Sequence, residues 1–207
     1  MCGRFSQHWE IADWDQAWPS DWRVPDYQGR YNVAPGSKIL VIVKGENGWV
    51  GGLATWGIPT PRAFLINARS ETVGTRPTFR RLLGAGRCVI PMNGYYEWHE
   101  QTRQPFYIRN PDTPLWALGL YQRGDSGALA VVLTRPAAAP LGVIHPRMPV
   151  VADRNLAEEW LYPGTEHIAN LLNLLREKEW SLVAHPVSNR VNKAANQGPD
   201  LIRPVDV

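Results

Sequence analysis

Residues 38–56, KILVIVKGENGWVGGLATW, decide the fold that the sequence predicts. Two apolar runs of strand length, 38–44 and 48–56, flank Glu46-Asn47-Gly48. Asn-Gly adopts the positive φ angles that a type I′ turn requires, so we expect the two runs to pair as an antiparallel hairpin. Runs of this length are far shorter than the roughly 20 apolar residues of a membrane helix, so we predict no membrane span.

Similar short runs continue outward from this hairpin. Strands are predicted at 64–68, 87–91, 95–99, 105–109, 115–121 and 128–134. Gly, Pro, Asn or Asp separates most of these runs, which is typical of antiparallel sheets. Helices are predicted near 8–18, at 77–83, and over 155–162 and 165–179, and Pro25-Asp26 breaks the chain after the first helix.

Length and composition favour one domain. A chain of 207 residues buries roughly 70% of its unfolded surface without a disulfide or metal. Hydrophobic residues at 44% and charged residues at 20% exclude a disordered or fibrous chain. No repeat or long linker divides the sequence. We therefore predict a single α+β domain over residues 1–207, mainly antiparallel β in barrel-like sheets with a few flanking helices.

Cysteine usage and the N-terminal segment bear on compartment and cofactors. Cys2 and Cys88 lie outside any CxxC or Cys/His spacing that binds zinc. The start MCGRFSQHWE lacks the basic and apolar regions of a signal peptide. We therefore expect a cytoplasmic protein with no membrane association, no metal and no other cofactor.

Cys2 has the most distinctive chemistry in the sequence. Removal of Met1 would leave a 1,2-aminothiol, with pKa values of about 8 for the amine and about 8.5 for the thiol, so both nucleophilic forms are expected to be accessible near neutral pH. The amine would attack an aldehyde to give an imine, and the thiolate would then close a five-membered thiazolidine ring. Intramolecular closure reaches effective molarities of about 10⁵ M, which predicts a long-lived adduct. The alternative is that Cys2 is an incidental second residue.

An arginine-rich segment suggests a partner. The whole chain carries a formal net charge of +3. Between residues 62 and 87, Glu71 is the single acid among six arginines, which are Arg62, Arg69, Arg76, Arg80, Arg81 and Arg87. Planar guanidinium groups match phosphate geometry, so the segment indicates a nucleic-acid surface. A general compositional preference for arginine over lysine would give the same pattern.

Four further side chains are candidates for function. Glu97 lies among aromatic residues in GYYEW, where a buried carboxylate needs a partner or a task, unless it faces outward. His145 lies between apolar stretches in VIHPRMPVV and is either structural or a proton carrier. Trp56 and Trp98 adjoin strand ends and either belong to the core or stack on a DNA base.

Eight segments, taken in order, resemble the SRAP family, the SOS-response-associated proteins that shield abasic sites in single-stranded DNA. The segments are MCGRF (1–5), RYNVAPG (30–36), TWGIP (55–59), INARSET (66–72), RCVIPMNGYYEW (87–98), QPFYI (104–108), IHPRMPVV (144–151) and HPVSNRVN (185–192). Because they extend over residues 1–192, the resemblance covers nearly the whole chain.

The resemblance implies an activity. The cysteine exposed by removal of Met1 would react with the aldehyde of an abasic site and form a thiazolidine DNA–protein crosslink. Cys2 is implied as the nucleophile, and Asn67 would position the amine and the sugar. Glu97 would orient the amine and assist proton transfer, and His145 would act as general acid/base in sugar ring opening and crosslink reversal.

The implied partner is single-stranded DNA bearing an abasic site, at a junction with duplex DNA, bound by a monomer. Residues expected along the DNA are Gly3, Arg4, Asn32, Pro35, Trp56, Arg69, Trp98, Thr134 and Arg147, to which the arginine-rich segment adds Arg76 and Arg80.

The chain departs from the family pattern in two places. Pro146 stands where the IHDRMP motif has Asp, and the stretch between Trp56 and Asn67 is short. Two alternative functions stay open. One is a thiol peptidase or self-processing hydrolase that uses Cys2 and His145, and the other is a module that binds single-stranded DNA without chemistry.

Overall fold

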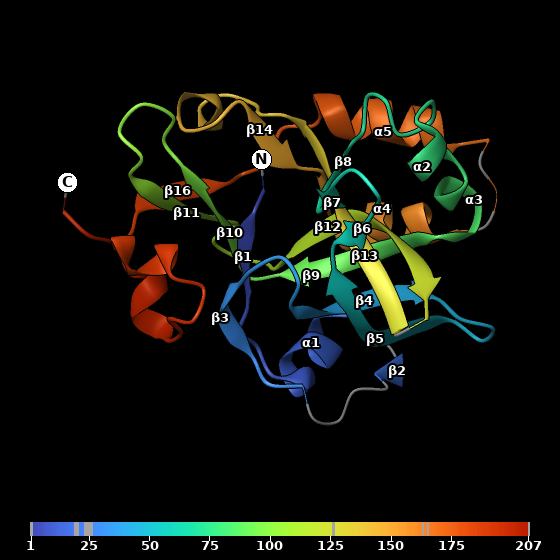
Figure 1. Ribbon diagram of the computed structural model, residues 1–207, viewed down its shortest axis with the longest axis horizontal. Coiled ribbons are helices and arrows are strands. Elements are labelled where there is room, and N and C mark those ends of the chain that lie inside the picture. The colour runs from blue at the N-terminus through green and yellow to red at the C-terminus, as the bar shows by residue number, and fades with distance from the viewer. Residues whose placement is uncertain are drawn as a thin grey trace.

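A ring of five strands forms the centre of the protein in the computed structural model (Figure 1), which describes residues 2–18, 21–22, 27–125, 127–162, 164 and 166–206. The strands are β4 (Lys38–Lys44), β5 (Trp49–Trp56), β9 (Arg87–Met92), β12 (Leu115–Gly124) and β13 (Gly127–Pro136). They pair in the order β13-β12-β9-β4-β5, and β5 pairs in parallel with β13, which closes the ring. The predicted barrel-like, mainly antiparallel architecture is confirmed.

Shorter strands extend this sheet. They are β2 (Asp21–Trp22) beside β5, β8 (Asn67–Arg69) and β14 (Arg147–Pro149) beside β13, and β15 (Val151–Ala152) beside β12. β6 (Ile58–Pro59) and β7 (Phe64–Leu65) form a separate pair. The predicted strand 64–68 is therefore divided between β7 and β8.

A second sheet of five strands contains the N-terminus. Its order is β16 (Val183–Pro186), β11 (Pro105–Arg109), β10 (Gly94–Trp98), β1 (Arg4–Gln7) and β3 (Arg30–Val33). β1 lies antiparallel to β10, with Arg4 opposite Tyr96. Since Cys2 lies two residues before the start of β1, this pairing carries it toward the end of β10.

The hairpin of β4 and β5 forms in the expected place, but its turn differs. Lys44 pairs with Trp49, so the connection has four residues, closed by a bond from the Gly45 N–H to the Gly48 carbonyl at 2.7 Å. Gly48 has a φ of +144°, while Arg103 is the only described non-glycine residue with positive φ. The type I′ turn was therefore a wrong prediction, because Asn47 does not adopt the left-handed conformation.

Helices cover the strands at several edges. They are α1 (Ile11–Ala17), α2 (Pro77–Arg80), α3 (Leu82–Ala85), α4 (Arg154–Leu161) and α5 (Ile168–Glu177), with 3₁₀ turns η1 (Leu141–Val143), η2 (Asn189–Asn192) and η3 (Pro199–Ile202). The helix predicted at 77–83 is divided at Arg81 into α2 and α3. The predicted break at Pro25-Asp26 lies outside the described residues.

The α4 helix is fixed to the ring by a tryptophan. Asp153 caps its N-terminus by accepting a bond from the Leu156 N–H at 3.0 Å. Trp160 is fully buried, and its indole N–H donates to the carbonyls of Cys88 and Gly119 at 3.0 and 3.3 Å. Full burial of an aromatic side chain contributes about 2–3 kcal/mol, so this residue holds α4 against β9 and β12.

A large apolar cluster fills the space between the two sheets. It joins Phe5 and Tyr95 of the N-terminal sheet to Ile90 and Val132 of the ring, and it includes Cys2. The cysteine therefore lies at the boundary between the sheets and is fully buried.

Candidate active site next to the N-terminus

Four residues expected to act together come from four separate segments and meet at Cys2. β8 pairs in parallel with β13, which sets Asn67 opposite Val132, and the Asn67 amide donates from Nδ2 to the Cys2 carbonyl at 2.9 Å. Glu97 of β10 acts electrostatically on the Cys2 thiol. His145 precedes β14, and its Nδ1 lies 3.9 Å from Oε1 of Glu97. The structure therefore brings Cys2, Asn67, Glu97 and His145 into one cluster.

Burial changes the chemistry of Cys2. It raises the pKa of the thiol well above its ordinary value, and the nearby Glu97 carboxyl raises this pKa further. The expectation that the thiolate is accessible near neutral pH is therefore wrong for this conformation. The buried sulfur carries its proton, so nucleophilic attack by the sulfur requires a neighbouring group that takes this proton.

Glu97 is the acidic side chain that acts on this thiol. Only 3% of Glu97 is exposed, and burial raises the pKa of its carboxyl to about 7. The outward-facing alternative is therefore wrong. A carboxyl with a pKa near the working pH both gives and takes protons efficiently, which suits general acid–base chemistry.

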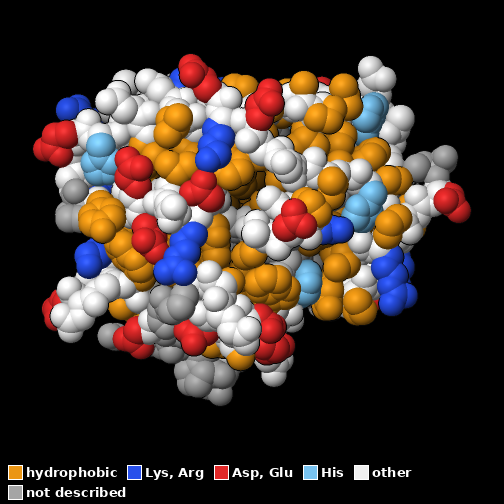
Figure 2. All heavy atoms as spheres, turned by 180° about the vertical axis from the view of Figure 1, so that it is seen from behind, with side chains coloured by type: hydrophobic (Ala, Val, Ile, Leu, Met, Phe, Trp, Pro, Cys, Tyr) orange, Lys and Arg blue, Asp and Glu red, His pale blue; other side chains and the backbone are white. Residues whose placement is uncertain are grey.

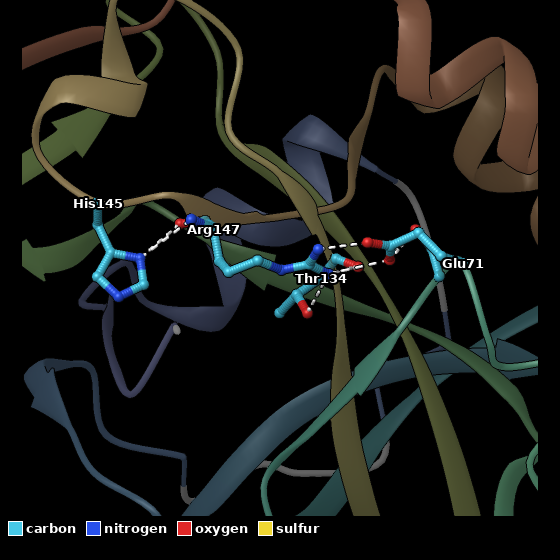
Figure 3. A network of polar contacts seen from close by, with 5 residues as sticks. Glu71, Thr134, His145 and Arg147 are labelled. Carbon is cyan, nitrogen blue, oxygen red and sulfur yellow. Dashed lines mark hydrogen bonds and ion pairs between the residues drawn. The ribbon is translucent and has the colours of Figure 1, made fainter.

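His145 is half-buried and neutral at pH 7. Burial lowers the pKa of its imidazole, and its Nδ1 accepts a hydrogen bond from the Arg147 N–H at 3.1 Å (Figure 3). This contact assigns the proton of the neutral ring to Nε2. Asn67 adds a second polar feature, because its Oδ1 is buried and has no hydrogen-bond partner in the described structure. An acceptor is thus available beside Cys2.

Three of the residues expected along DNA are fully buried in this structure, so their side chains are not on its surface and their contact with DNA stays a prediction. Trp56 packs on Phe5 with ring centroids 4.7 Å apart and donates to the Ile66 carbonyl at 2.9 Å. Thr134 accepts a hydrogen bond from Arg147. Asn32 donates to three carbonyls of the C-terminal segment, those of Val191, Lys193 and Asn196. These side chains position neighbouring segments instead of forming a surface.

The remaining expected residues do reach the surface. Arg69, Arg76 and Arg80 are exposed, and Gly3, Arg4, Pro35 and Trp98 are half-buried.

Arg4 and Trp98 hold the C-terminal segment in a way that the sequence did not predict. Arg4 donates to the Val191 carbonyl at 2.8 Å, its guanidinium lies 6.0 Å from the Trp98 ring, and Trp98 donates to Asn192 at 2.7 Å. The string HPVSNRVN offered the only signal for this role.

The arginine-rich segment is exposed except at its end. Arg87 is 5% exposed, and its guanidinium donates to backbone carbonyls of Trp160 and Tyr162, so this arginine is structural. The other five arginines of the segment are exposed. Figure 2 shows the face behind that of Figure 1, on which acidic and basic side chains are interspersed with hydrophobic ones. That face therefore lacks the uniform positive charge that would bind a phosphate backbone.

Two structural features are absent from the described residues. Across the described residues, no three His, Cys, Asp or Glu side chains gather where they could hold a metal ion. Within the same part of the chain, no helix has the length and apolar character needed to cross a membrane.

Fold and site together define an α+β protein with a buried cysteine next to the N-terminus and near a carboxyl of raised pKa. The chain belongs to the family described as SOS response associated peptidase (SRAP), whose pattern matches residues 1–194. The family resemblance seen in the sequence motifs is therefore confirmed.

Relatives of the chain carry a common name. Abasic site processing protein YoqW of Bacillus subtilis is 34% identical over 98% of this chain and 99% of its own length. Abasic site processing protein YedK of Escherichia coli is 31% identical over 99% of this chain and all of its own length. Abasic site processing protein HMCES of Pongo abelii is 28% identical over the whole chain and 77% of its own length.

Solved structures share the fold. A phage-related protein from Bordetella bronchiseptica has a TM-score of 0.74 and 29% identity, with 90% of this chain and 94% of that chain covered. A protein from Bacteroides thetaiotaomicron has a TM-score of 0.82 at 20% identity, with 99% and 100% covered, and shows likeness of fold alone.

Proposed function

We propose that this protein recognises abasic sites in single-stranded DNA and, once Met1 has been removed, forms a covalent thiazolidine crosslink to them through Cys2. The observation that carries the proposal is the position of the Cys2 thiol beside Glu97, whose carboxyl has a pKa of about 7. The relatives named abasic site processing proteins support the choice of substrate.

The reaction requires two proton transfers that one carboxyl performs. The Cys2 amine adds to the aldehyde of the opened sugar, and the protonated Glu97 gives its proton to the departing hydroxyl, which leaves as water. The product is an iminium ion facing a Glu97 carboxylate. The sulfur then bonds to the iminium carbon while its proton passes to that carboxylate. The carboxyl is thereby restored, and the ring nitrogen is left neutral.

His145 and Asn67 have separate roles in this reaction. His145 moves a proton when the sugar ring opens or closes, and Asn67 positions the Cys2 amine. A neutral imidazole near pH 7 takes the proton from the anomeric hydroxyl and gives it to the ring oxygen as the C1′–O4′ bond breaks, so the imidazole ends the step neutral; the same group moves the proton in the opposite direction when the sugar closes again after crosslink reversal. The unpartnered Oδ1 of Asn67 accepts a hydrogen bond from the Cys2 amine and so holds the amine in place.

Exposed arginines supply the noncovalent contact with DNA. Arg69 is the last residue of β8, the strand that begins at Asn67, and Arg76 and Arg80 are exposed in the following segment. Their guanidinium groups would bind phosphates of the single-stranded DNA whose abasic site reaches Cys2. The half-buried Trp98 contributes an aromatic ring on which a base can stack. In this proposal the protein acts as a monomer.

The test is an incubation of the processed protein with a single-stranded oligonucleotide that bears one abasic site. After denaturation we expect a shifted band, whose intact mass equals protein plus oligonucleotide minus one water. Cys2→Ala abolishes the band. Cys88→Ala, which removes the other buried thiol, retains it. A band that survives Cys2→Ala, or a reactive protein that still carries Met1, contradicts the proposal.

A thiol peptidase would behave differently in the same experiment. Thiol peptidases need a cysteine of lowered pKa, whereas burial raises the pKa of Cys2. A peptidase would cleave a peptide substrate and form no adduct, and a passive binder of single-stranded DNA would do neither.

A further inference from the structure

Glu71 is the single acid of the arginine-rich segment, and it follows β8 in the turn toward α2. Its two carboxylate oxygens accept from the two terminal nitrogens of Arg147, with Nη2 to Oε2 at 3.0 Å (Figure 3). This bidentate contact holds the pKa of Glu71 at about 2. Glu71 is therefore ionised at every pH at which the protein would work.

Arg147 is occupied by protein groups. Besides Glu71, its Nη2 donates to the carbonyl and the hydroxyl of Thr134 at 2.8 and 3.1 Å. Only 14% of the Arg147 side chain is exposed. In this structure Glu71 occupies the fork of Arg147 that a phosphate would use, so contact of Arg147 with DNA stays a prediction that requires this ion pair to open.

The backbone of Arg147 contacts His145. The Arg147 N–H donates to Nδ1 at 3.1 Å, and the Arg147 carbonyl lies 3.2 Å from the same nitrogen. The neutral ring accepts from the N–H, and the protonated ring can donate to the carbonyl. One backbone position therefore supports both protonation states of the imidazole, which a group that repeatedly gains and loses a proton requires.

The loop is held on its other side as well. The Ala137 N–H donates to the Pro146 carbonyl at 2.9 Å, which joins the loop to the end of β13. The antiparallel pairing of β14 with β13, which sets Pro136 opposite Arg147, and a bond from the Glu100 N–H to the Ile144 carbonyl at 3.2 Å hold it too. The Arg147 side chain adds a further anchor, since its guanidinium reaches across β13 to the turn that carries Glu71 (Figure 3). Without the carboxylate, a largely buried guanidinium would lose its counter-ion, which favours movement of the side chain toward water.

We propose that Glu71 is a positioning residue for His145, because it fixes Arg147 so that the Arg147 backbone stays at Nδ1 in both protonation states. The inference rests on the proposed function insofar as His145 is the proton carrier of that reaction. Its structural part needs no DNA and is tested separately.

The test measures the tautomer and pKa of His145 by long-range ¹H–¹⁵N correlation spectra of the full chain. The charged groups of the described residues that act on this ring are Glu97, Glu100 and Arg103, with the Arg147 backbone at Nδ1. None of these groups is changed in Glu71→Gln. The matched control is Glu158→Gln, which removes the acid of an ion pair with Arg154 on α4.

In the wild-type protein and in Glu158→Gln we expect the Nε2–H tautomer and a depressed His145 pKa. In Glu71→Gln we expect a mixture of tautomers and a pKa that returns toward about 6.5 as the ring becomes hydrated. The pH profile of crosslink reversal should move in the same direction. Should Glu71→Gln fail to fold, Arg147→Lys carries the same expectation, because a lysine keeps the charge but cannot make the bidentate contact.

The inference is overturned if a folded Glu71→Gln keeps the wild-type tautomer and pKa. Tighter binding to DNA together with an unchanged His145 spectrum would show instead that Glu71 only blocks Arg147. Failure of the wild-type protein to form a crosslink would reject the proposed function, while the His145 spectra would still decide the role of Glu71.

Discussion

Replacing Glu97 by Gln should stabilise the protein at pH 8 and leave its stability unchanged at about pH 4. Burial raises the pKa of Glu97 from 4.5 to about 7, so the folded state favours the protonated carboxyl. Below pH 4.5 this carboxyl is protonated in the folded and unfolded states alike. As the pH rises toward 7, the unfolded chain loses the proton more readily, and the folded protein becomes less stable.

The size of the effect follows from the two pKa values. Each pKa unit corresponds to about 1.4 kcal/mol, so the rise from 4.5 to about 7 lowers the free energy of unfolding by about 3 kcal/mol above pH 7. Glutamine has a similar shape and no charge to desolvate. With a urea m-value of about 2 kcal/mol/M, the unfolding midpoint of Glu97→Gln should lie about 1.5 M higher at pH 8.

Urea titrations at pH 4.5, 6 and 8, followed by tryptophan fluorescence, measure this difference. The control is Glu158→Gln, since Glu158 forms a partly exposed ion pair with Arg154 at 2.9 Å and should change stability by less than about 0.5 kcal/mol. The reasoning fails if Glu97→Gln is no more stable than the wild type at pH 8, or if its gain is the same at all three pH values.

Four further outcomes are expected. Glu71→Gln should show the opposite pH dependence, because the pKa of the Glu71 carboxyl is lowered from 4.5 to about 2 in the folded protein. In urea titrations the wild type should have the higher free energy of unfolding above pH 4.5, and this difference should disappear toward pH 2. Trp160→Ala should lower the free energy of unfolding by about 3–5 kcal/mol, and a loss below 1 kcal/mol would contradict the role assigned to this indole. His145→Ala should slow crosslink reversal more than crosslink formation, and equal slowing of both measured rates would remove that division of roles. Anisotropy titrations with undamaged single-stranded DNA should give a log–log salt slope of about −2, as three phosphate contacts predict, whereas a flat response would argue against the exposed arginines.

Local sequence patterns predicted most of the strands. The runs that became β4, β5, β9, β12 and β13 alternate or cluster apolar residues between turn formers, and such signals depend on neighbours in the chain. Barrel-like sheets were expected, but which strands close the ring was not predicted. Closure depends on the parallel pairing of β5 with β13, and β9 and β12 separate these two strands along the chain.

The candidate site was likewise predicted only in part from the sequence. Cys2 is identified from the sequence because an aminothiol next to Met1 is a covalent property. Glu97 and His145 were candidates, but their protonation states follow from burial and from contacts with distant segments. Glu71 was noticed only as the lone acid among arginines, and nothing in its surroundings along the chain indicates that it binds Arg147.

The sequence by itself determined the family, the mainly antiparallel architecture and the cysteine on which the proposed chemistry depends, because these follow from covalent order and local periodicity. Only the tertiary structure decided that Trp56 belongs to the core, that the Cys2 thiol keeps its proton and that Arg147 is already bound by Glu71. The physical reason is that burial and charge pairing arise where separate segments meet. Desolvation in such places changes what a side chain does without changing its identity.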